Sequence, residues 1–375
     1  MVSIHIDIKT RILPAAHRVY VVRPGAHYRL YDEVKAQNAI LYDLPGLELP
    51  EGVAFRQVED IAAQIQRGQA LKWWHRVGRH AGDDQPSMDL ANYPYPVSPS
   101  ERRSLSQLLS IGSAYFEKAR VGDLVVVPPL RFADPVLVGE IAEQEPVETT
   151  VPAYGDLPVL GRRVRWLAEM PKKDVPARII EISQKPNSFV LLERSTATWF
   201  YDRTYRSYVL NGEYQCELRV GAENFGSTDD MRLSAFLNFV VANMAALETH
   251  NVPQSIGAAV FANLGEYEPG KRISINSPGE IIVHALKLSP LLFVALLGLS
   301  GCAPAEVNAA IADGTVTFGN SAALPGDPCA AAVFKSTVDW LTFVGADLWA
   351  EACPIASSAL NSAEVELPAV VNVVP

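Results

Sequence analysis

The chain has 375 residues, 49% hydrophobic and 20% charged, which is typical of a globular protein with room for two domains. Its net charge of −10 comes from residues 221–375, which carry five basic side chains against fifteen acidic ones, while the rest of the chain is balanced. This distribution excludes a molecule that binds nucleic acid through its overall charge, and it leaves room for a local basic surface on the amino-terminal part.

Residues 1–9 alternate apolar and polar side chains like a strand, and they lack the charged-then-apolar layout of a secretory signal. The four cysteines have no spacing that chelates zinc or indicates a disulfide framework. We therefore expect reduced cysteines in a cytoplasmic protein, with no metal and no cofactor. The cysteines are Cys216, Cys302, Cys329 and Cys353.

Strands dominate the prediction for the first half of the chain, with helices over 61–70 and 99–120 as exceptions. The second helix is predicted to begin with Ser98 as its cap and Pro99 at its first position. Its apolar residues then recur at helical spacing. It leads directly into a Gly-Asp turn, as expected of a helix packed beneath a small sheet.

Residues 122–167 contain the clearest strand pattern. β-branched, apolar runs at 122–127, 136–141 and 162–167 are separated by Gly, Asp and Pro, which is typical of a small β-barrel. A Gly-Asp pair lets the chain reverse before a buried strand. Gly139 lies inside one of these strands, where we expect a backbone or a ligand to approach closely.

This order of elements resembles the EVE/PUA-like domains, particularly the branch joined to restriction-type and antiphage proteins of prokaryotes. The matching segments are 19–28, 38–43 and 163–167, and the resemblance covers roughly residues 15–195, with 73–97 as an insertion. It implies an α+β fold in which a PUA-like small β-barrel with flanking helices forms a ligand-binding domain over residues 1–221. It also implies recognition of a modified base in DNA or RNA, or of a nucleotide-like ligand, in antiphage defence.

After residue 222 the composition changes to Ala-rich helices. Residues 194–226 are a polar, aromatic junction, and we place the domain boundary near 222. Residues 222–375 are predicted to be mainly α-helical and to mediate homo-oligomerisation or contact an effector protein. The predicted starts are Ser227, Ser277-Pro278, Ser289-Pro290, Ala303-Pro304 and Asp327-Pro328, with long helices over 231–250 and 330–352.

Two further segments complete this half. Residues 281–301 are apolar, but His284, Lys287 and Pro290 interrupt them, so we expect a buried helix pair and no membrane partner. A short strand is predicted over 315–318. The tail, 365–375, is apolar and β-leaning, so it needs a partner strand from this chain or from a neighbouring one.

The sequence contains no recognisable catalytic constellation. Glu33 and Lys35 have the ending of a restriction-type metal site, but they lack an upstream carboxylate on an adjacent strand, and a solvated turn is favoured. His27, His75 and His80 have no ligand partners at metal spacing. Phosphate loops, nucleophile elbows and metalloprotease helices are also absent. We therefore expect a protein without a catalytic role.

Aromatic and basic residues of the first domain give a better indication of function. Single bases are commonly held by stacking on aromatic rings, with Arg on phosphates. About two thirds of these aromatics are expected to fill the core, and the others to form a cage. The predicted ligand-binding residues are Arg23, Tyr28, Tyr42, Pro128, Arg131, Arg163 and Trp166.

Two alternatives stay open. In the first, the acidic carboxy-terminal domain assembles a multimer and the barrel is a docking module. In the second, weaker one, the protein is an enzyme of unfamiliar type that uses residues around 201–223.

Overall fold

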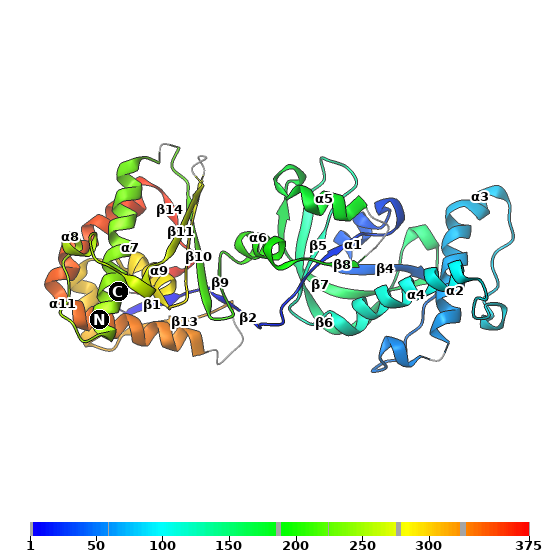
Figure 1. The fold of residues 1–375 in the computed structure, drawn as a ribbon, viewed down its shortest axis with the longest axis horizontal. Coiled ribbons are helices and arrows are strands. Elements are labelled where there is room, and N and C mark those ends of the chain that lie inside the picture. The colour runs from blue at the N-terminus through cyan, green and yellow to red at the C-terminus, as the bar shows by residue number, and fades with distance from the viewer. Residues whose placement is uncertain are drawn as a thin grey trace. The chain divides into compact units, whose positions relative to one another are not determined.

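The computed structural model describes residues 3–58, 60–184, 189–223, 225–274, 279–322 and 328–374. The chain forms two compact units (Figure 1). The central unit is Ala16–Trp199, and the terminal unit combines Met1–Ala15 with Phe200–Pro375. Both units mix helices and strands, so the predicted α+β class is confirmed.

This division differs from the predicted one at residues 221 and 222. The first strand of the chain and the strand over 213–220 pair with strands from the carboxy-terminal region, and the strand over 207–210 pairs with 213–220. All three therefore belong to the terminal unit. The predicted junction at 194–226 includes part of this unit's sheet.

The central unit contains one six-stranded sheet in the order β4-β7-β6-β5-β3-β8. Strand β3 runs parallel to β5, and the other neighbours are antiparallel. Within the described residues this sheet is open, with β4 and β8 at its ends, so the predicted closed barrel is not found. The strands are β3 (Val19–Val22), β4 (Ala39–Pro45), β5 (Leu124–Val127), β6 (Val136–Thr150), β7 (Pro158–Met170) and β8 (Phe189–Leu191).

The strands of this sheet form where the sequence is apolar and β-branched, as predicted. Every residue of β4 and β5 is buried, because helices and loops cover the sheet there. Helix α4 begins at Pro99, as predicted, although the Ser98 side chain makes no capping hydrogen bond. The helices of the central unit are α1 (Tyr31–Ala36), α2 (Ile61–Trp73), α3 (Arg79–Ala81), α4 (Pro99–Ser113) and α5 (Ala177–Gln184); α6 (Arg194–Tyr205) contains the boundary between the units.

The terminal unit contains two sheets. One has the order β13-β1-β15, and the other has the order β11-β12-β10-β9-β2, with β14 also paired to β10. The strands are β1 (Ser3–Asp7), β2 (Arg11–Leu13), β9 (Ser207–Leu210), β10 (Glu213–Val220), β11 (Gly270–Ser274), β12 (Gly279–Ala285), β13 (Val316–Gly319), β14 (Val365–Glu366) and β15 (Val370–Val374).

Helices form most of the core of the terminal unit. Helix α9 is buried along nearly its whole length, and α7 and α11 pack against it. Helix α11 is interrupted at Gly345, whose φ of 77° is left-handed. The helices are α7 (Ser227–Glu248), α8 (Ile256–Ala259), α9 (Ser289–Leu299), α10 (Pro304–Ala312) and α11 (Pro328–Ser362).

Two predictions for this region are corrected. Residues 279–285 form strand β12 rather than the first helix of a buried pair, because the run Ile281-Ile282-Val283 is β-branched and pairs with β10 and β11. The predicted helix start at Ser277-Pro278 lies outside the described residues. Residues after 222 are therefore less uniformly helical than predicted.

Two other predictions for the terminal unit are confirmed. The strand predicted over 315–318 is β13, and the tail finds its partner strands within this chain, with β14 on β10 and β15 on β1. In the part of the chain that the structure describes, no single helix has the length and apolar composition needed to cross a membrane. Helices α9 and α10 have this length and apolar composition only when taken together as a pair, and the pair is bent by 114°.

Candidate functional site

The central unit contains a cavity of about 370 Å³ beside strand β4. Its walls come from the loop after β3, from β4 itself and from helices α2 and α4, which pack against one another. The lining residues are Arg23, Gly25, Ala26, Tyr42, Asp43, Leu44, Gln69, Lys72, Ser104, Gln107, Leu108 and Ile111.

A buried carboxylate lines this cavity. The side chain of Asp43 is only 6% exposed, and both of its oxygens accept hydrogen bonds. One oxygen accepts from the main-chain N–H of Ala26 at 2.8 Å and from Lys72 Nζ at 2.6 Å. The other accepts from Arg29 Nη2 at 3.2 Å and from the hydroxyl of Tyr154. Asp43 is therefore a fixed anchor whose two oxygens already have donors.

The loop after β3 reaches this carboxylate because Gly25 has a left-handed conformation, with φ of 75°. A Cβ at this position would lie 3.0 Å from Leu30 Cγ and 3.2 Å from Asp43 Cγ. Glycine removes both the conformational cost and the contact. The loop can then present the Ala26 N–H to Asp43 and place Arg23 at the cavity wall.

Positive charge exceeds negative charge among the side chains at this site. Arg23 and Lys72 line the cavity, and Arg29 lies behind Asp43, the one acidic residue among the lining residues. Burial lowers the pKa of Arg29 and Asp43 opposes this effect, so the guanidinium keeps its charge at neutral pH. An anion entering the cavity would therefore meet attractive charge that Asp43 balances only in part.

A histidine lies behind the same cluster. The ring of His75 meets that of Tyr154 edge-on, with centroids 5.6 Å apart. Its pKa is lowered by burial and, to a smaller extent, by Arg79 and Arg29, so the ring is neutral at neutral pH. The buried Nε2 of His75 has no hydrogen-bond partner within the described ranges.

The outer wall of the cavity is polar and comes from two helices. Gln69 lies on α2, one turn from Lys72, and Ser104 and Gln107 lie on α4. All three of these polar residues are exposed. A primary amide offers both donors and an acceptor, which is the complement of the edge of a heterocyclic base.

Two of the seven predicted ligand-binding residues line this cavity. Arg23 does so while its guanidinium lies 5.2 Å from the centre of the Tyr28 ring. Tyr42 also lines it, but its ring is 2% exposed and packs among Phe55 and two other rings. Its hydroxyl donates to the Leu108 carbonyl at 2.8 Å. Tyr42 therefore offers no open face for stacking a base.

The other five predicted residues do not line the cavity. The hydroxyl of Tyr28 donates to the Ser183 carbonyl at 2.6 Å, and Pro128 is buried at the end of β5. Each of the remaining three has its own surroundings: Arg131 is exposed and pairs with Asp134 at 2.7 Å, Arg163 donates to the Gln37 carbonyl at 3.2 Å, and Trp166 is half-buried against the core of the unit. The structure does not bring the seven predicted residues together into one cage.

Sequence reasoning missed the central residue of the cavity. Asp43 is the one charged residue in β4, whose other residues are apolar or aromatic. A charged residue inside an otherwise apolar strand is seldom buried without partners, so the sequence could have indicated that Asp43 has charged partners. Lys72, Gln69 and Gln107 gave no comparable signal, because polar residues at helical spacing usually mark a solvated face.

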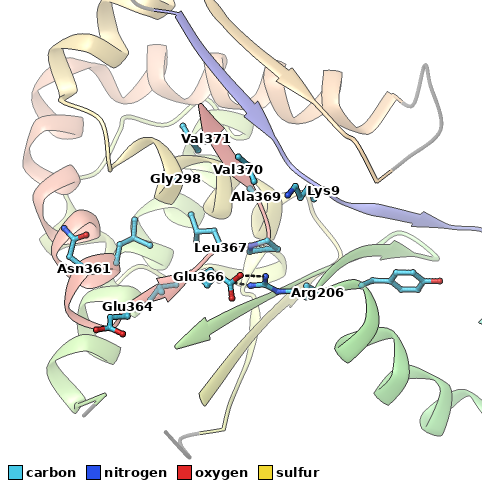
Figure 2. A pocket seen from close by; sticks show the side chains of 14 residues that line it. Lys9, Arg206, Gly298, Asn361, Glu364, Glu366, Leu367, Ala369, Val370 and Val371 are labelled. Carbon is cyan, nitrogen blue, oxygen red and sulfur yellow. Dashed lines mark hydrogen bonds and ion pairs between the residues drawn. The ribbon is translucent and has the colours of Figure 1, made fainter. Parts of the chain in front are cut away.

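The terminal unit has a larger cavity, of about 730 Å³, where the links β1–β2 and β14–β15 run from one sheet to the other. Figure 2 shows Arg206 beside Glu366, with Lys9 near Ala369. Arg206 donates to the Glu366 carboxylate at 3.1 Å and to its carbonyl at 2.9 Å. The opposite charges of Arg206 and Glu366 are thus paired, and this cavity has no comparable excess of positive charge.

No family model, curated protein or solved structure matches this chain. Among the described residues there is also no group of three or more His, Cys, Asp or Glu side chains placed to hold a metal ion.

Proposed function

We propose that the cavity of the central unit binds a small anionic ligand with a hydrogen-bonding ring, as a nucleotide has, and that the protein recognises this ligand without transforming it. The observation that carries the proposal is the pair of cations, Arg29 and Lys72, on the single buried carboxylate of Asp43, with Arg23 lining the same cavity.

The excess of positive charge favours an anion. Lys72 and Arg29 both contact Asp43, which cancels one of their two charges, and Arg23 adds another at the wall. Arginine and lysine are the usual partners of phosphate oxygens in proteins. A phosphate in the cavity would come close to Arg23 and Lys72, because both line it.

The polar wall and the volume favour a ring of base size. A cavity of about 370 Å³ lies within the range of small-molecule sites. Gln69 and Gln107 can donate to and accept from the edge of such a ring. Because the Tyr42 ring is buried, recognition through edge hydrogen bonds replaces the aromatic cage expected from the sequence.

The resemblance to EVE/PUA-like domains supports a base as the ring, and it is the sole support for a PUA-like relationship and for a role in antiphage defence. A base within a nucleic acid would have to leave the stack to enter the cavity, at a cost of a few kcal/mol. A recognition role also agrees with Asp43, whose two oxygens are both engaged by donors within the protein.

The test is a calorimetric titration with nucleoside 5′-monophosphates, including 5-methyl- and 5-hydroxymethylcytidine monophosphate. Arg23→Met removes one positive charge from the cavity wall, and we expect it to weaken binding by about tenfold or more, the value of a charge-assisted hydrogen bond. Binding by the wild type at millimolar ligand or better is required, and its absence for every nucleotide would contradict the proposal.

Arg131→Met is the matched control. It removes the same charge from the same unit, but Arg131 is exposed and lies outside the cavity. We expect unchanged affinity for this variant at physiological salt. Equal losses for Arg23→Met and Arg131→Met would indicate attraction to the whole surface rather than binding in the cavity.

A further inference from the structure

Strand β15 is an unprotected edge of the terminal unit. In the sheet β13-β1-β15 it pairs with β1 on one side only. Its sequence, Val-Val-Asn-Val-Val, contains no charge and no proline, the two devices that commonly protect an edge strand. Three of its residues are large, exposed hydrophobics: Val370 is 37% exposed, Val373 45% and Val374 58%.

The direction of its unpaired main-chain groups follows from the neighbouring strands. On the side of β1 that faces β13, the N–H of Ile4 donates to the Thr315 carbonyl at 3.1 Å and the N–H of Ile8 to the Gly319 carbonyl at 3.0 Å. Main-chain groups alternate along a strand, so His5 points the opposite way, toward β15. His5 is paired with Asn372, and the groups of Val371 and Val373 therefore point away from β1.

These outward groups have no partner in the part of the chain that the structure describes. Figure 2 shows β15 beside β1, with Val370 and Val371 at its start. Exposed main-chain groups of this kind are satisfied by water or by another strand, and an added strand also covers the exposed valines.

The sequence of β15 is the same in both directions about Asn372. An antiparallel copy of the strand, related by a twofold axis at Asn372, therefore places valine opposite valine at all of the remaining positions. The outward main-chain groups of Val371 then form hydrogen bonds with those of Val373 of the second copy, and the groups of Val373 form them with Val371 of that copy. A twofold interface requires this kind of self-complementarity.

We propose that a second copy of this chain pairs with β15 in antiparallel orientation, centred on Asn372, and joins the two three-stranded sheets into one continuous sheet. This inference is independent of the ligand proposed for the central unit. The absence of charge along β15 matters here, because the terminal unit is otherwise strongly acidic and two copies would repel.

The contact is small. Five residues a side are far fewer than the roughly 20–30 of a standard stable interface. We therefore expect a dimer that depends on concentration, forming from micromolar to several hundred micromolar protein. Sedimentation equilibrium of the full chain should show the mass rising from 40.9 kDa toward twice that value.

Asn372 offers a sharp test because it faces its own copy across the axis. The two residues form a pair without main-chain hydrogen bonds, in which side chains are closest. Asn372→Lys places two ammonium groups opposite each other, and Asn372→Asp places two carboxylates. Each variant alone should remain monomeric, and an equimolar mixture of the two should recover the dimer as a heterodimer.

The side chain of Asn372 is exposed, so both variants should keep the fold, which circular dichroism and the thermal midpoint would check. Three results would overturn the proposal: a wild type that stays monomeric at several hundred micromolar, single variants that dimerise as strongly as the wild type, or a mixture that stays monomeric. The second result would place a dimer contact elsewhere on the molecule.

Discussion

Among single residues, Asp43 makes the contacts that hold the cavity of the central unit together. Its carboxylate is 6% exposed and holds together Lys72, Arg29, Tyr154 and the loop after β3. Asp43→Asn leaves two cations with a neutral partner in a buried site. We expect the free energy of unfolding of the central unit to fall by about 3 kcal/mol, as when one member of a buried ion pair is removed. Denaturation in guanidinium chloride measures this change.

Asp134→Asn is the control for that substitution. Asp134 also pairs with an arginine, Arg131, but the arginine is 70% exposed. Exposed ion pairs contribute little, so we expect a change within about 0.5 kcal/mol. Similar decreases in the free energy of unfolding for both variants would show that the ion pairs of Asp43 stabilise the unit no more than an exposed ion pair does.

His75 predicts a dependence of stability on pH. Its pKa in the folded protein is lowered from 6.5, first by burial and then by Arg79 and Arg29. A lowered pKa means that the unfolded chain takes up the proton more readily, so the stabilising contribution is present above pH 6.5 and is lost as the pH falls below it. His75→Phe keeps a ring against Tyr154 and removes this contribution.

The measurement is the difference in thermal midpoint between wild type and His75→Phe as a function of pH. Carboxylates titrate in both proteins and cancel in the difference. We expect the variant to gain on the wild type as the pH falls below about 6.5. A difference that stays constant across this range would contradict the lowered pKa.

The cavity residues show what sequence can and cannot predict at this scale. Arg23 was predicted as one of the basic residues that accompany the aromatics of the first domain, and it lines the cavity. Lys72 and Gln107 lie 35 positions apart in the chain, on α2 and α4, and only the packing of these helices brings them to one cavity. The packing of one helix on another cannot be predicted from the periodicity of a single sequence.

At the scale of elements, the sheet of the central unit depends on close approach at Gly139. A Cβ there would lie 2.5 Å from Val164 Cγ1 and 2.8 Å from the Arg165 carbonyl oxygen. The neighbouring β6–β7 register shifts at this point. The expected close approach is confirmed, and the approaching group is the neighbouring strand.

Gly139→Ala should therefore destabilise the central unit by about 2 kcal/mol, the usual cost of forcing an extra methyl into a packed site. Gly257→Ala is the comparison, because a Cβ at Gly257 in α8 meets nothing within 4 Å. We expect this second variant to be neutral or slightly stabilising. Unfolding curves that leave Gly139→Ala as stable as the wild type would show that the strands can separate there at little cost.

Most elements were predicted from periodicity and from turn residues, and strand β12 is the clearest exception. Residues 281–301 were predicted to form a buried helix pair because they are apolar, yet the β-branched run at their start forms β12 between β10 and β11. Pairing with distant strands decided the outcome, as it often does for short apolar segments.

At the scale of the whole molecule, the compact units predict which fragments fold. Residues 222–375 lack β1, β9 and β10, although β10 is the partner of both β12 and β14. We expect fragment 222–375 to be unfolded or aggregated, and fragment 16–199 to unfold cooperatively by itself. Circular dichroism during thermal denaturation compares them.

A folded, monomeric fragment 222–375 would contradict the division into units. The first strand supports the same division: Ile4 and Ile6 are fully buried in β1, between β13 and β15. Their alternation predicted a strand, but nothing near them in the sequence indicates partners more than 300 positions away. This is why the domain boundary was placed near 222 rather than within α6.

The central claim is that a nucleotide-like anion enters the cavity beside β4. Its most direct test follows the side-chain amide resonances of Gln69, Gln107 and Gln37 by ¹⁵N nuclear magnetic resonance during addition of a nucleoside monophosphate. Gln37 bonds to the Thr150 carbonyl and lies outside the cavity, so it serves as the internal reference. The account predicts saturable shifts at Gln69 and Gln107 with Gln37 unchanged; unchanged amides at both cavity positions under saturating ligand would contradict it.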